Sequence, residues 1–305
     1  MNIKEEFSDF LTEKYNQDHV IQDAENYYFY KHIYVADDFV FGIFDKEELK
    51  YNYAASFNDP YDTQFNLKVD TKNITKRDFE FATKKKISTH QWNHVKRLIP
   101  MMIGKFESEL KEEINKAING LREQIPITCF NSNPLSILMW SHYAKNHTGF
   151  MLEYKIPKDW SSDLVVFPIS YTDNYPVISM TISQLFEISR SSPDDPNEDL
   201  IKSMFLHKST CWAYEKEYRA FDFDKSGKEN PLLIRFDPNL LSSVVIGSRF
   251  KDTGKFDLLQ QKLSAFNERN GLDVELYEAS LYEDRYELKV DNHPRLSEEN
   301  YKKFK

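Results

Sequence analysis

The sequence predicts an α+β fold for this chain of 305 residues. Short runs rich in aromatic and β-branched residues recur along it and are typical of strands, most clearly at residues 27–35, which read YYFYKHIYV. Longer segments in which apolar residues recur every three or four positions stand among these runs and predict helices. Because no linker-like change of composition and no internal repeat divides the chain, we expect one α+β domain over residues 27–290.

The first half is expected to hold a strand-rich part and a helical insertion. Residues 1–26 read as an N-terminal amphipathic helix or lead-in, and residues 38–53 as a short helix or turn followed by a strand. The Asn-Asp-Pro sequence at 58–60 predicts a turn, because Asn and Asp bond to their own backbone and Pro presets φ. The charged segment 72–124 predicts a helical insertion, whose role as a solvated helix, a lid, an interface or a target-recognition element stays open. Residues 291–305 are expected to form a C-terminal tail.

Strands dominate the second half, and helices are inserted among them. We expect helices at 135–144, 179–209 and 253–269. The first of these should have Asn133 as its cap and Pro134 at its first position, because Asn accepts bonds from free helical amides and Pro lacks the amide that would go unpaired. The expected strands lie at residues 125–130, 148–154, 164–171, 217–222, 232–236, 243–246 and 274–279.

The composition narrows the classes of function. The formal net charge is −9 at pH 7, so broad nonspecific binding of nucleic acid is not expected, although a local basic groove is compatible with it. The chain has only 8 Gly and contains neither G-x-G-x-x-G nor G-x-x-x-x-G-K-[ST], which argues against a Gly-rich phosphate loop. Aromatic residues make up 15% of the chain and favour a core, and a pocket, built on rings.

The cysteines and the apolar segments bear on the compartment. Cys129 and Cys211 are far apart and match no zinc or redox spacing, so we expect two reduced, buried thiols. No apolar run approaches the length of a membrane span, and the N-terminal residues lack a signal-peptide pattern. These features predict a cytoplasmic protein with no membrane association.

Two carboxylates stand close together near the middle of the second half. If Glu215–Arg219 begins a strand, Glu215 and Glu217 point to the same face, because side chains alternate along a strand. Two ionised carboxylates on one face repel each other, and one of them would then have a raised pKa. The alternative is a solvated edge strand on which the carboxylates pair with Lys216 or Arg219.

The histidines do not predict a metal site. His90 and His94 are four residues apart in a probable helix, but Gln91 stands where a zinc metalloprotease has its glutamate. His142 and His147 are five apart and do not share a helix face, so they read as hydrogen-bonded side chains at a helix end. No metal is expected from these residues.

One pattern of acidic residues is compatible with a magnesium-dependent nuclease. Glu153 and Lys155 end a predicted strand, and Asp59 and Asp62 lie upstream. A carboxylate followed by E-x-K on a strand can hold a magnesium ion and position a water for cleavage of a phosphodiester. Asp59 also has an adequate role as a turn former.

Four segments together resemble a bacterial family of unknown function. That family is defined by an F-N-D-P-[FY] motif, an M-W-x-H-Y-A motif and a W-x-Y-E-x-E-[YF]-R motif, and some of its members occur in phage-defence or abortive-infection settings. The segments follow the order of the family motifs between Tyr28 and Phe223. They are Ser56–Tyr61, Cys129–Ala144, His147–Tyr154 and Lys208–Arg219.

The same order of motifs is more distantly similar to ADP-ribosyltransferases. Those enzymes carry an Arg or His on a first strand, a Ser- or Tyr-bearing motif at a middle strand, and a catalytic Glu on a late strand. His32 stands on the first strand here, Thr128–Ser132 in the middle segment, and Glu215–Glu217 in the late one. The resemblance implies a split β-sheet core with inserted helices.

The resemblance also implies roles for individual residues. Glu217 would stabilise the oxocarbenium-like charge that develops on the ribose of NAD, and Glu215 would orient the nucleophile. His32 would bind a ribose hydroxyl or the diphosphate, and a ring such as Tyr143 or Phe130 would stack on nicotinamide. The residues expected to contact NAD are Tyr30, His32, Phe130, Asn131, Ser132, Tyr143 and His142.

The expected function is therefore that of an NAD-dependent ADP-ribosyltransferase. NAD would be its substrate, no metal would be needed, and a nucleic acid or a protein would be the acceptor. The family's settings favour a toxin or an anti-phage defence effector, and they leave room for an antitoxin or regulator protein as a partner. The alternatives are a magnesium-dependent nuclease and a non-catalytic sensor or interaction protein.

Overall fold

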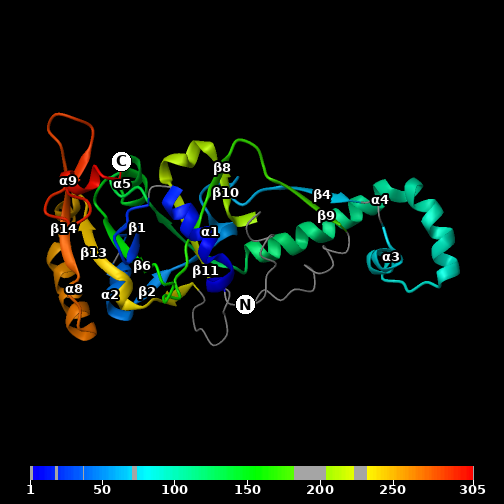
Figure 1. The fold of residues 1–305 in the computed structure, drawn as a ribbon, viewed down its shortest axis with the longest axis horizontal. Coiled ribbons are helices and arrows are strands. Elements are labelled where there is room, and N and C mark those ends of the chain that lie inside the picture. Colours follow the sequence, from blue (N-terminus) through cyan, green and yellow to red (C-terminus); the bar gives the residue numbers. More distant parts are fainter. Residues whose placement is uncertain are drawn as a thin grey trace.

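The computed structural model describes residues 3–17, 20–36, 38–70, 74–181, 204–222 and 232–304. Helices and a large mixed β-sheet make up the fold, which confirms the α+β class (Figure 1). Most of the helix expected at 179–209 lies outside the described residues. Cys129 is half-buried and Cys211 is exposed, so the prediction of two buried thiols was wrong. No helix in the described ranges is long and apolar enough to cross a membrane.

A nine-stranded sheet forms the centre of the molecule. Its strands pair antiparallel except for β13 and β14, which are parallel. Most strands expected from alternating or β-branched runs are present, whereas the run at 164–171 is divided into two short strands, β7 and β8. In spatial order the strands are β15 (Leu288–Val290), β14 (Glu275–Leu281), β13 (Leu241–Ile246), β6 (Phe150–Pro157), β1 (Asn26–Ile33), β5 (Pro126–Asn131), β11 (Glu217–Phe221) and β7 (Phe167–Pro168), with β3 (Asn52–Tyr53) also paired to β5.

Three pairs of short strands lie outside this sheet. They are β2 (Glu48–Lys50) with β12 (Leu233–Arg235), β8 (Ser170–Thr172) with β10 (His207–Ser209), and β4 (Asn66–Asp70) with β9 (Val177–Thr181).

The prediction of a helix over 179–209 was wrong at both ends, because residues 179–181 belong to strand β9 and residues 207–209 form strand β10, which pairs with β8. Burial alternates from residue to residue along Val177–Thr181, and three of its five residues, Val177, Ile178 and Thr181, are β-branched. Parallel pairing with β4, more than 100 residues earlier in the chain, fixes this segment as a strand. That partner cannot be identified from a local pattern.

The helices vary from single turns to one very long element. The helical character expected within 72–124 is confirmed by α3 and α4, and that expected at 253–269 is confirmed by α8. The helices are α1 (Ile3–Gln17), α2 (Gly42–Lys46), α3 (Lys76–Thr83), α4 (Thr89–Arg122), α5 (Ile137–Tyr143), α8 (Phe256–Asn270) and α9 (Glu298–Tyr301), with 3₁₀ turns η1 (Asp38–Phe41), η2 (Ala54–Ser56), η3 (Thr210–Glu215), η4 (Pro238–Leu240) and η5 (Phe250–Thr253).

The predicted start of α5 was wrong. The helix begins at Ile137, and the Ser136 hydroxyl is its cap, accepting a bond from the amide of Met139 at 3.4 Å. Residues 133–136 form a turn closed by a bond from the Ser136 amide to the Asn133 carbonyl, and the Asn133 side chain donates instead to the Tyr214 carbonyl at 3.0 Å. A long-range bond to η3 therefore takes the side chain that the local pattern assigned to the cap.

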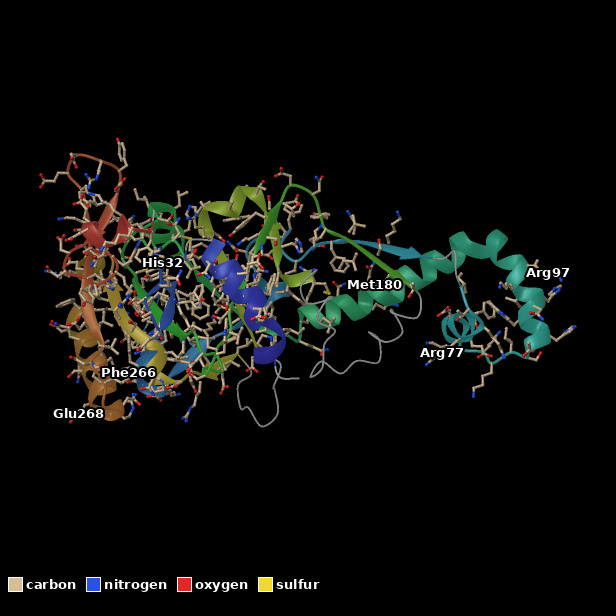
Figure 2. All side chains as sticks on the ribbon, in the orientation of Figure 1. His32, Arg77, Arg97, Met180, Phe266 and Glu268 are labelled. Carbon is tan, nitrogen blue, oxygen red and sulfur yellow. The ribbon has the colours of Figure 1, made fainter. Side chains whose placement is uncertain are left out.

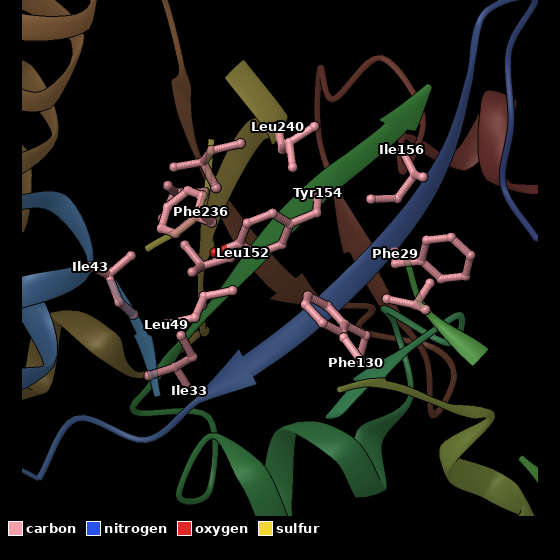
Figure 3. Packing of buried hydrophobic residues seen from close by; sticks show 14 of the residues in the cluster. Phe29, Ile33, Ile43, Leu49, Phe130, Leu152, Tyr154, Ile156, Phe236 and Leu240 are labelled. Carbon is pink, nitrogen blue, oxygen red and sulfur yellow. The ribbon is translucent and has the colours of Figure 1, made fainter. Parts of the chain in front are cut away.

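Apolar residues cover both faces of the sheet. One face packs Phe29, Phe130, Leu152 and Tyr154 in a cluster that continues into α1, α2 and α8 (Figure 3). The other face packs Tyr30, Trp140 and Met151 with residues near the C-terminus, among them the fully buried Leu296 of the predicted tail. Because alternate residues of each strand point to opposite faces, neighbours such as Phe29 and Tyr30 serve different clusters.

A polar row crosses the second face. Register pairs Ser243 with Glu153, Glu153 with Tyr30, Tyr30 with Asn131, and Asn131 with Glu217, so five side chains from five neighbouring strands point the same way. All five are buried, and burial requires each polar group to find a partner. This row positions the candidate site at its Glu217 end.

The sheet opens next to this row. β1 and β5 pair only at Tyr30 and Asn131, while β3 takes the far end of β5 through Asn52 and Ile127. Between these points, the edge of β5 has no paired strand among the described residues on the β1 side. The two strands therefore separate immediately after residue 30 of β1.

An arm extends from the body of the molecule. The long helix α4 leaves the sheet region, β4 and β9 run beside it, and α3 packs at its far end (Figure 1). Pro100 lies inside α4, where a proline removes one amide donor and bends a helix, and the ribbon changes direction toward that end. Figure 2 shows Arg77 and Arg97 at the tip, far from His32 in the sheet.

Candidate active site

A cavity of about 320 Å³ lies where β1 and β5 separate. It is lined by side chains from four separate segments of the chain, which local folding alone would not bring together. The lining residues that carry polar or aromatic groups are Lys31, His32, Asn52, Ser56, Phe57, Asn58, Asp62, Thr128, Cys129, Phe130, Asn131, Tyr143, Lys208, Glu215, Glu217 and Arg219.

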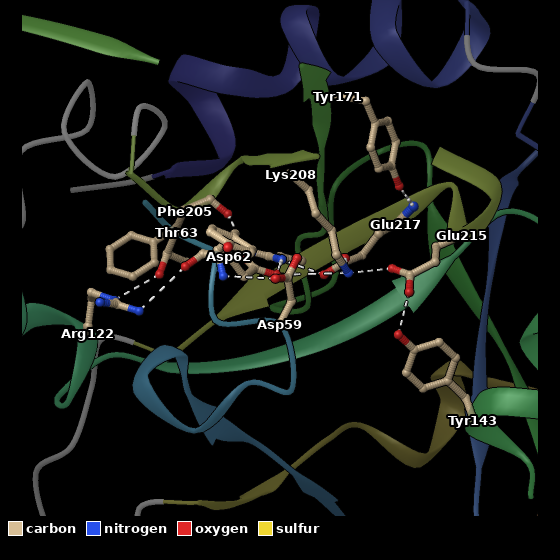
Figure 4. A network of polar contacts seen from close by, with 12 residues as sticks. Asp59, Asp62, Thr63, Arg122, Tyr143, Tyr171, Phe205, Lys208, Glu215 and Glu217 are labelled. Atoms are coloured by element: carbon tan, nitrogen blue, oxygen red, sulfur yellow. Dashed lines mark hydrogen bonds and ion pairs between the residues drawn. The ribbon is translucent and has the colours of Figure 1, made fainter. Parts of the chain in front are cut away.

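Lys208 is the centre of a buried ion cluster (Figure 4). Its Nζ lies 2.5 Å from Glu215 Oε2 and 2.8 Å from Glu217 Oε2, and 3.9 Å from Asp62 Oδ2. The Trp212 ring lies 5.0 Å from the same ammonium. Lys208 is 7% exposed, so these carboxylates, rather than water, balance its charge.

Arg219 binds the other side of the same carboxylates. Its Nε donates to Glu217 Oε1 at 2.6 Å, its Nη2 to Asp62 Oδ2 at 2.6 Å, and its Nη1 to the Phe205 carbonyl at 2.8 Å. The Phe57 ring lies 5.1 Å from the guanidinium carbon. The Arg219 side chain has no exposed surface. Its hydrogen-bond partners and the Phe57 ring therefore keep the guanidinium in one orientation.

Local backbone geometry separates the two glutamates. Glu215 ends the 3₁₀ turn η3, Lys216 follows in the left-handed region with φ 45°, and β11 begins at Glu217. Glu215 is therefore not on the strand, which differs from the expected alternation along one strand. The turn nevertheless brings both carboxylates to Lys208.

The two glutamates differ in their proton affinity. Burial raises the pKa of Glu215, and the nearby Lys208 offsets this only in part. Burial acts in the same direction on Glu217, but Arg219 and Lys208 outweigh it and hold its pKa far below the usual range. Burial would lower the pKa of Lys208, yet the two glutamates raise it overall. The site therefore holds one firmly ionised carboxylate beside one that accepts a proton more readily.

A tyrosine on α5 completes the Glu215 environment. The Tyr143 hydroxyl donates to Glu215 Oε1, and burial together with that carboxylate raises the pKa of Tyr143. His142, the neighbouring residue, is exposed and lies 2.9 Å from the Tyr214 hydroxyl. Of this pair, only Tyr143 lines the cavity.

His32 lines the cavity as a neutral ring. Its Nδ1 lies 3.1 Å from Asn131 Nδ2, an amide donor, and its Nε2 lies 3.3 Å from the Pro134 carbonyl. These partners assign the proton to Nε2, because a carbonyl can only accept. Burial lowers the pKa of His32 to about 3, so the ring is uncharged near neutral pH.

Lys31 bridges the opening in the sheet. Its Nζ donates to Thr128 Oγ1 at 2.8 Å and to the Cys129 carbonyl at 2.9 Å, both on the unpaired edge of β5. Loss of solvent around the ammonium lowers its pKa. Lys31 thus places a positive charge, with neutral hydrogen-bond partners, on the wall of the cavity.

The structure gathers some predicted site residues and separates others. His32, Phe130, Asn131, Tyr143, Glu215 and Glu217 line the cavity. Three others do not: Tyr30 is fully buried and donates to Glu153 at 3.0 Å, the hydroxyl of Ser132 is buried without a hydrogen-bond partner among the described residues, and His142 is exposed.

The residues expected for a nuclease lie in two places. Glu153 is paired with Arg295, while Asp62 belongs to the Arg219 cluster. Three strand spacings separate Glu153 from Glu217, about 14 Å at the usual spacing. Within the described ranges, no group of three or more His, Cys, Asp or Glu is placed to hold a metal ion.

Three cavity residues had no role in the sequence reasoning about NAD. Lys208 begins one of the quoted motifs, but nothing in a sequence says that a lysine will be buried between carboxylates. Lys31, the neighbour of His32, was assigned no role. Asp62 was considered as a metal ligand, whereas it pairs with Arg219 and leaves Oδ1 buried without a hydrogen-bond partner among the described residues.

The Asn-Asp-Pro turn places Asp62. The Asp59 carboxylate accepts from the Tyr61 amide at 2.8 Å, and the Asp59 carbonyl from the Asp62 amide at 3.1 Å. Asp59 therefore has the turn-forming role expected of it. The turn carries Asp62 into the ion cluster.

Comparison with known proteins gives one match. Residues 139–220 match the sequence model of a family described as "Protein of unknown function (DUF2971)". This segment supplies Met139, Tyr143, Lys208, Glu215, Glu217 and Arg219 to the cavity wall. No curated protein and no solved structure matches the chain.

Proposed function

We propose that this protein is an NAD-dependent ADP-ribosyltransferase that modifies a nucleic acid or a protein. One observation carries the proposal: His32, Asn131 and Glu217, which the resemblance assigns to NAD, line one cavity where β1 and β5 separate. A second cavity of about 540 Å³ shares Lys31, His32 and Asn52 with the first. Both volumes are in the range of small-molecule sites.

Glu217 is the proposed stabiliser of the reacting ribose. In the reaction, the bond between ribose C1′ and the nicotinamide nitrogen breaks, its electron pair leaves with nicotinamide, and the ribose becomes oxocarbenium-like. Glu217 stays ionised and has about four acceptor positions, of which Lys208 and Arg219 use two. It can therefore accept a ribose hydroxyl and stabilise the developing charge.

Glu215 is the proposed general base. A hydroxyl of the acceptor attacks C1′, and its proton passes to the Glu215 carboxylate as the new C–O bond forms. The raised pKa of Glu215 makes it a stronger base than an ordinary carboxylate. Tyr143 holds this carboxylate through its hydroxyl and offers a ring at the cavity wall.

Lys31 is the proposed partner of the NAD diphosphate. Its ammonium lines both cavities, and among the described residues its hydrogen bonds go to two neutral oxygens, so a phosphate would add an anionic partner to this set. The neutral His32 ring adds apolar surface beside it. A magnesium-dependent nuclease is supported less well, because Glu153 and Asp62 belong to different ion clusters.

Hydrolysis of NAD tests the proposal without a known acceptor, because water can replace the acceptor hydroxyl. We expect the purified protein to release nicotinamide at ~1 mM NAD. Glu217→Gln and Glu215→Gln should each reduce the rate by about 100-fold or more, because each removes a charge used in the transition state. Glu217→Gln removes a carboxylate that the buried Lys208 and Arg219 share, which destabilises the fold. Glu215→Gln is therefore measured as a second variant.

Glu153→Gln is the matched control. Glu153 is as buried as Glu217 and is also bound by an arginine, but it does not line the cavity. It should retain the rate within a few fold once folding is checked by thermal melting. If the wild-type protein neither binds nor hydrolyses NAD, the transferase proposal fails and a non-catalytic sensor becomes the better account.

The proposal extends to a toxic or defensive role. Expression of the wild-type chain should then arrest bacterial growth, and Glu217→Gln should relieve the arrest at equal protein level. An antitoxin or regulator protein would be expected to bind the wild-type chain and restore growth.

A further inference from the structure

We propose that the tip of the arm, residues 74–98, binds single-stranded nucleic acid through its phosphates and one unstacked base. The tip comprises α3, the loop that follows it and the beginning of α4. Binding there does not depend on the chemistry of the cavity.

The tip has a charge opposite to that of the rest of the chain. It contains seven Lys or Arg and two acidic residues, a surplus of five positive charges. The whole chain carries −9, so the remainder carries −14. A basic surface isolated on an acidic protein is an electrostatic footprint for phosphate, and the acidic body disfavours nonspecific binding elsewhere.

Most of these cations are available to a ligand. The two carboxylates of the tip are engaged: Asp78 accepts from the Thr75 amide at 2.7 Å, and Glu80 accepts from the Ile87 amide at 2.8 Å and lies 3.6 Å from Lys76. The other cations are exposed, and none makes a hydrogen bond or close ion pair with a described residue. They are Arg77, Lys84, Lys85, Lys86, Lys96 and Arg97.

A groove between α3 and α4 lies among these cations. It has a volume of about 540 Å³ and is lined by Phe79, Thr83, Lys85, Ile87, His90, Gln91, His94 and Val95. The Phe79 ring on the groove wall packs against the Trp92 ring, with centroids 6.0 Å apart. An unstacked base can stack on aromatic rings and imidazoles while lysines bind the neighbouring phosphates. A single strand offers such a base, whereas in a duplex the bases stay stacked and paired.

The tip does not fit a membrane surface. Peripheral helices bind lipid by burying a broad apolar face together with their charges. Among the tip residues whose side chains the structure describes, Leu98 is the one large apolar side chain that is exposed. Charge without such a face favours a soluble polyanion.

Fluorescence anisotropy with a labelled 20-nucleotide single strand tests the site. Lys84→Glu/Lys85→Glu/Lys86→Glu should lower affinity at least tenfold at ~100 mM salt. It should also reduce the slope of log K against log salt by about 2, because each phosphate contact contributes about 0.7. Lys251→Glu/Lys302→Glu/Lys303→Glu, an equal charge change on exposed body residues, should change affinity less than twofold.

The groove has its own test. His90→Ala/His94→Ala should weaken single-strand binding severalfold and leave the salt slope unchanged, because it removes ring surface and no permanent charge. Circular dichroism checks that each variant folds. Equal affinities of the Lys84–Lys86 variant and the body control, or binding of phosphatidylserine vesicles without binding of the oligonucleotide, would overturn the proposal. An unchanged affinity in the histidine variant would overturn the assignment to a single strand.

Discussion

Glu217 and Glu153 are both buried carboxylates bound by an arginine, but only Glu217 lines a cavity. Glu217 is bound by Arg219 and Lys208 at the wall of a cavity, and Glu153 is bound by Arg295 and Ser243 inside the packed sheet. Both avoid the cost of an unpaired buried charge. Only the first lies beside open space, next to the carboxylate of Glu215, whose pKa is raised. Access to the cavity therefore distinguishes the candidate catalytic group from the structural one.

A buried histidine should make the protein sensitive to acid. His293 accepts from the amides of Arg295 and Leu296 at Nδ1, so its proton is on Nε2, which faces Ser243. Burial lowers its pKa to about 4 despite the nearby Glu153. The unfolded chain takes up this proton near pH 6.5, so the stabilisation is complete above pH 6.5 and is lost as pH falls toward 4.

Urea unfolding at two pH values measures this effect. Between pH 7.5 and pH 5, His293 should account for a loss of about 2 kcal/mol in the free energy of unfolding. His293→Gln should remove that share of the pH dependence while lowering stability at pH 7.5. The exposed His142→Gln is the control. The same pH dependence in wild type and His293→Gln would contradict the assignment.

At the scale of elements, the separation of β1 from β5 makes the site. Paired along their whole length, the two strands would close the sheet over the cavity. They meet at Tyr30 and Asn131 only, and Lys31 bonds across the opening to Thr128 and Cys129. The Lys31 ammonium stabilises the opening by donating to the Cys129 carbonyl, which has no strand partner on this side among the described residues, and to the Thr128 hydroxyl.

Replacing Lys31 separates binding from stability. Lys31→Met keeps the length of the side chain and removes a charge that is costly to desolvate, so the melting temperature should stay within about 4 °C of wild type. NAD affinity measured by calorimetry should fall about tenfold, since a phosphate loses its ammonium partner. Lys155→Met, on the neighbouring strand β6 and outside the cavity, should keep wild-type affinity. A Lys31→Met protein that binds NAD normally would exclude this role for Lys31.

Local patterns predicted the elements whose burial follows one simple period. The runs at 125–130 and 217–222 became β5 and β11, and the segment 253–269 became α8. Errors arose where a distant partner decides. β9 is a strand because β4 pairs with it, and Asn133 is no cap because Tyr214 takes its amide. Such partners cannot be read from a window of neighbouring residues.

The whole molecule has a packed body and a basic arm attached near the site. Neither of the apolar clusters described on the two faces of the sheet includes a residue of 74–98. At the other end of α4, the Nε of Arg122 donates to the Thr63 hydroxyl at 2.9 Å. Thr63 directly follows Asp62, which lines the cavity. The arm therefore joins the proposed nucleic-acid surface to the turn that lines the cavity.

Hydrogen exchange should resolve these two parts. Amides of α3 and the first turns of α4 should exchange by local opening at a lower free energy than those of β1 and β6, because Ile74 is the one buried apolar residue among the tip side chains that the structure describes. Mass spectrometry of peptides over 74–98 and 26–33 would measure the difference. Equal protection in both peptides would show that the arm and body open as one unit.

Local patterns in the chain were enough to predict the α+β class, most element positions and several of the segments that line the cavity. Periodicity, turn residues and the polar motifs are local properties, and local properties can be read from a chain. Only the tertiary structure decided that Lys208 and Arg219 hold Glu217 between them, that Asp62 joins them, and that Tyr30 and Glu153 stay outside the cavity. These contacts depend on strand register and burial, which are set by the packing of distant segments rather than by neighbours in sequence.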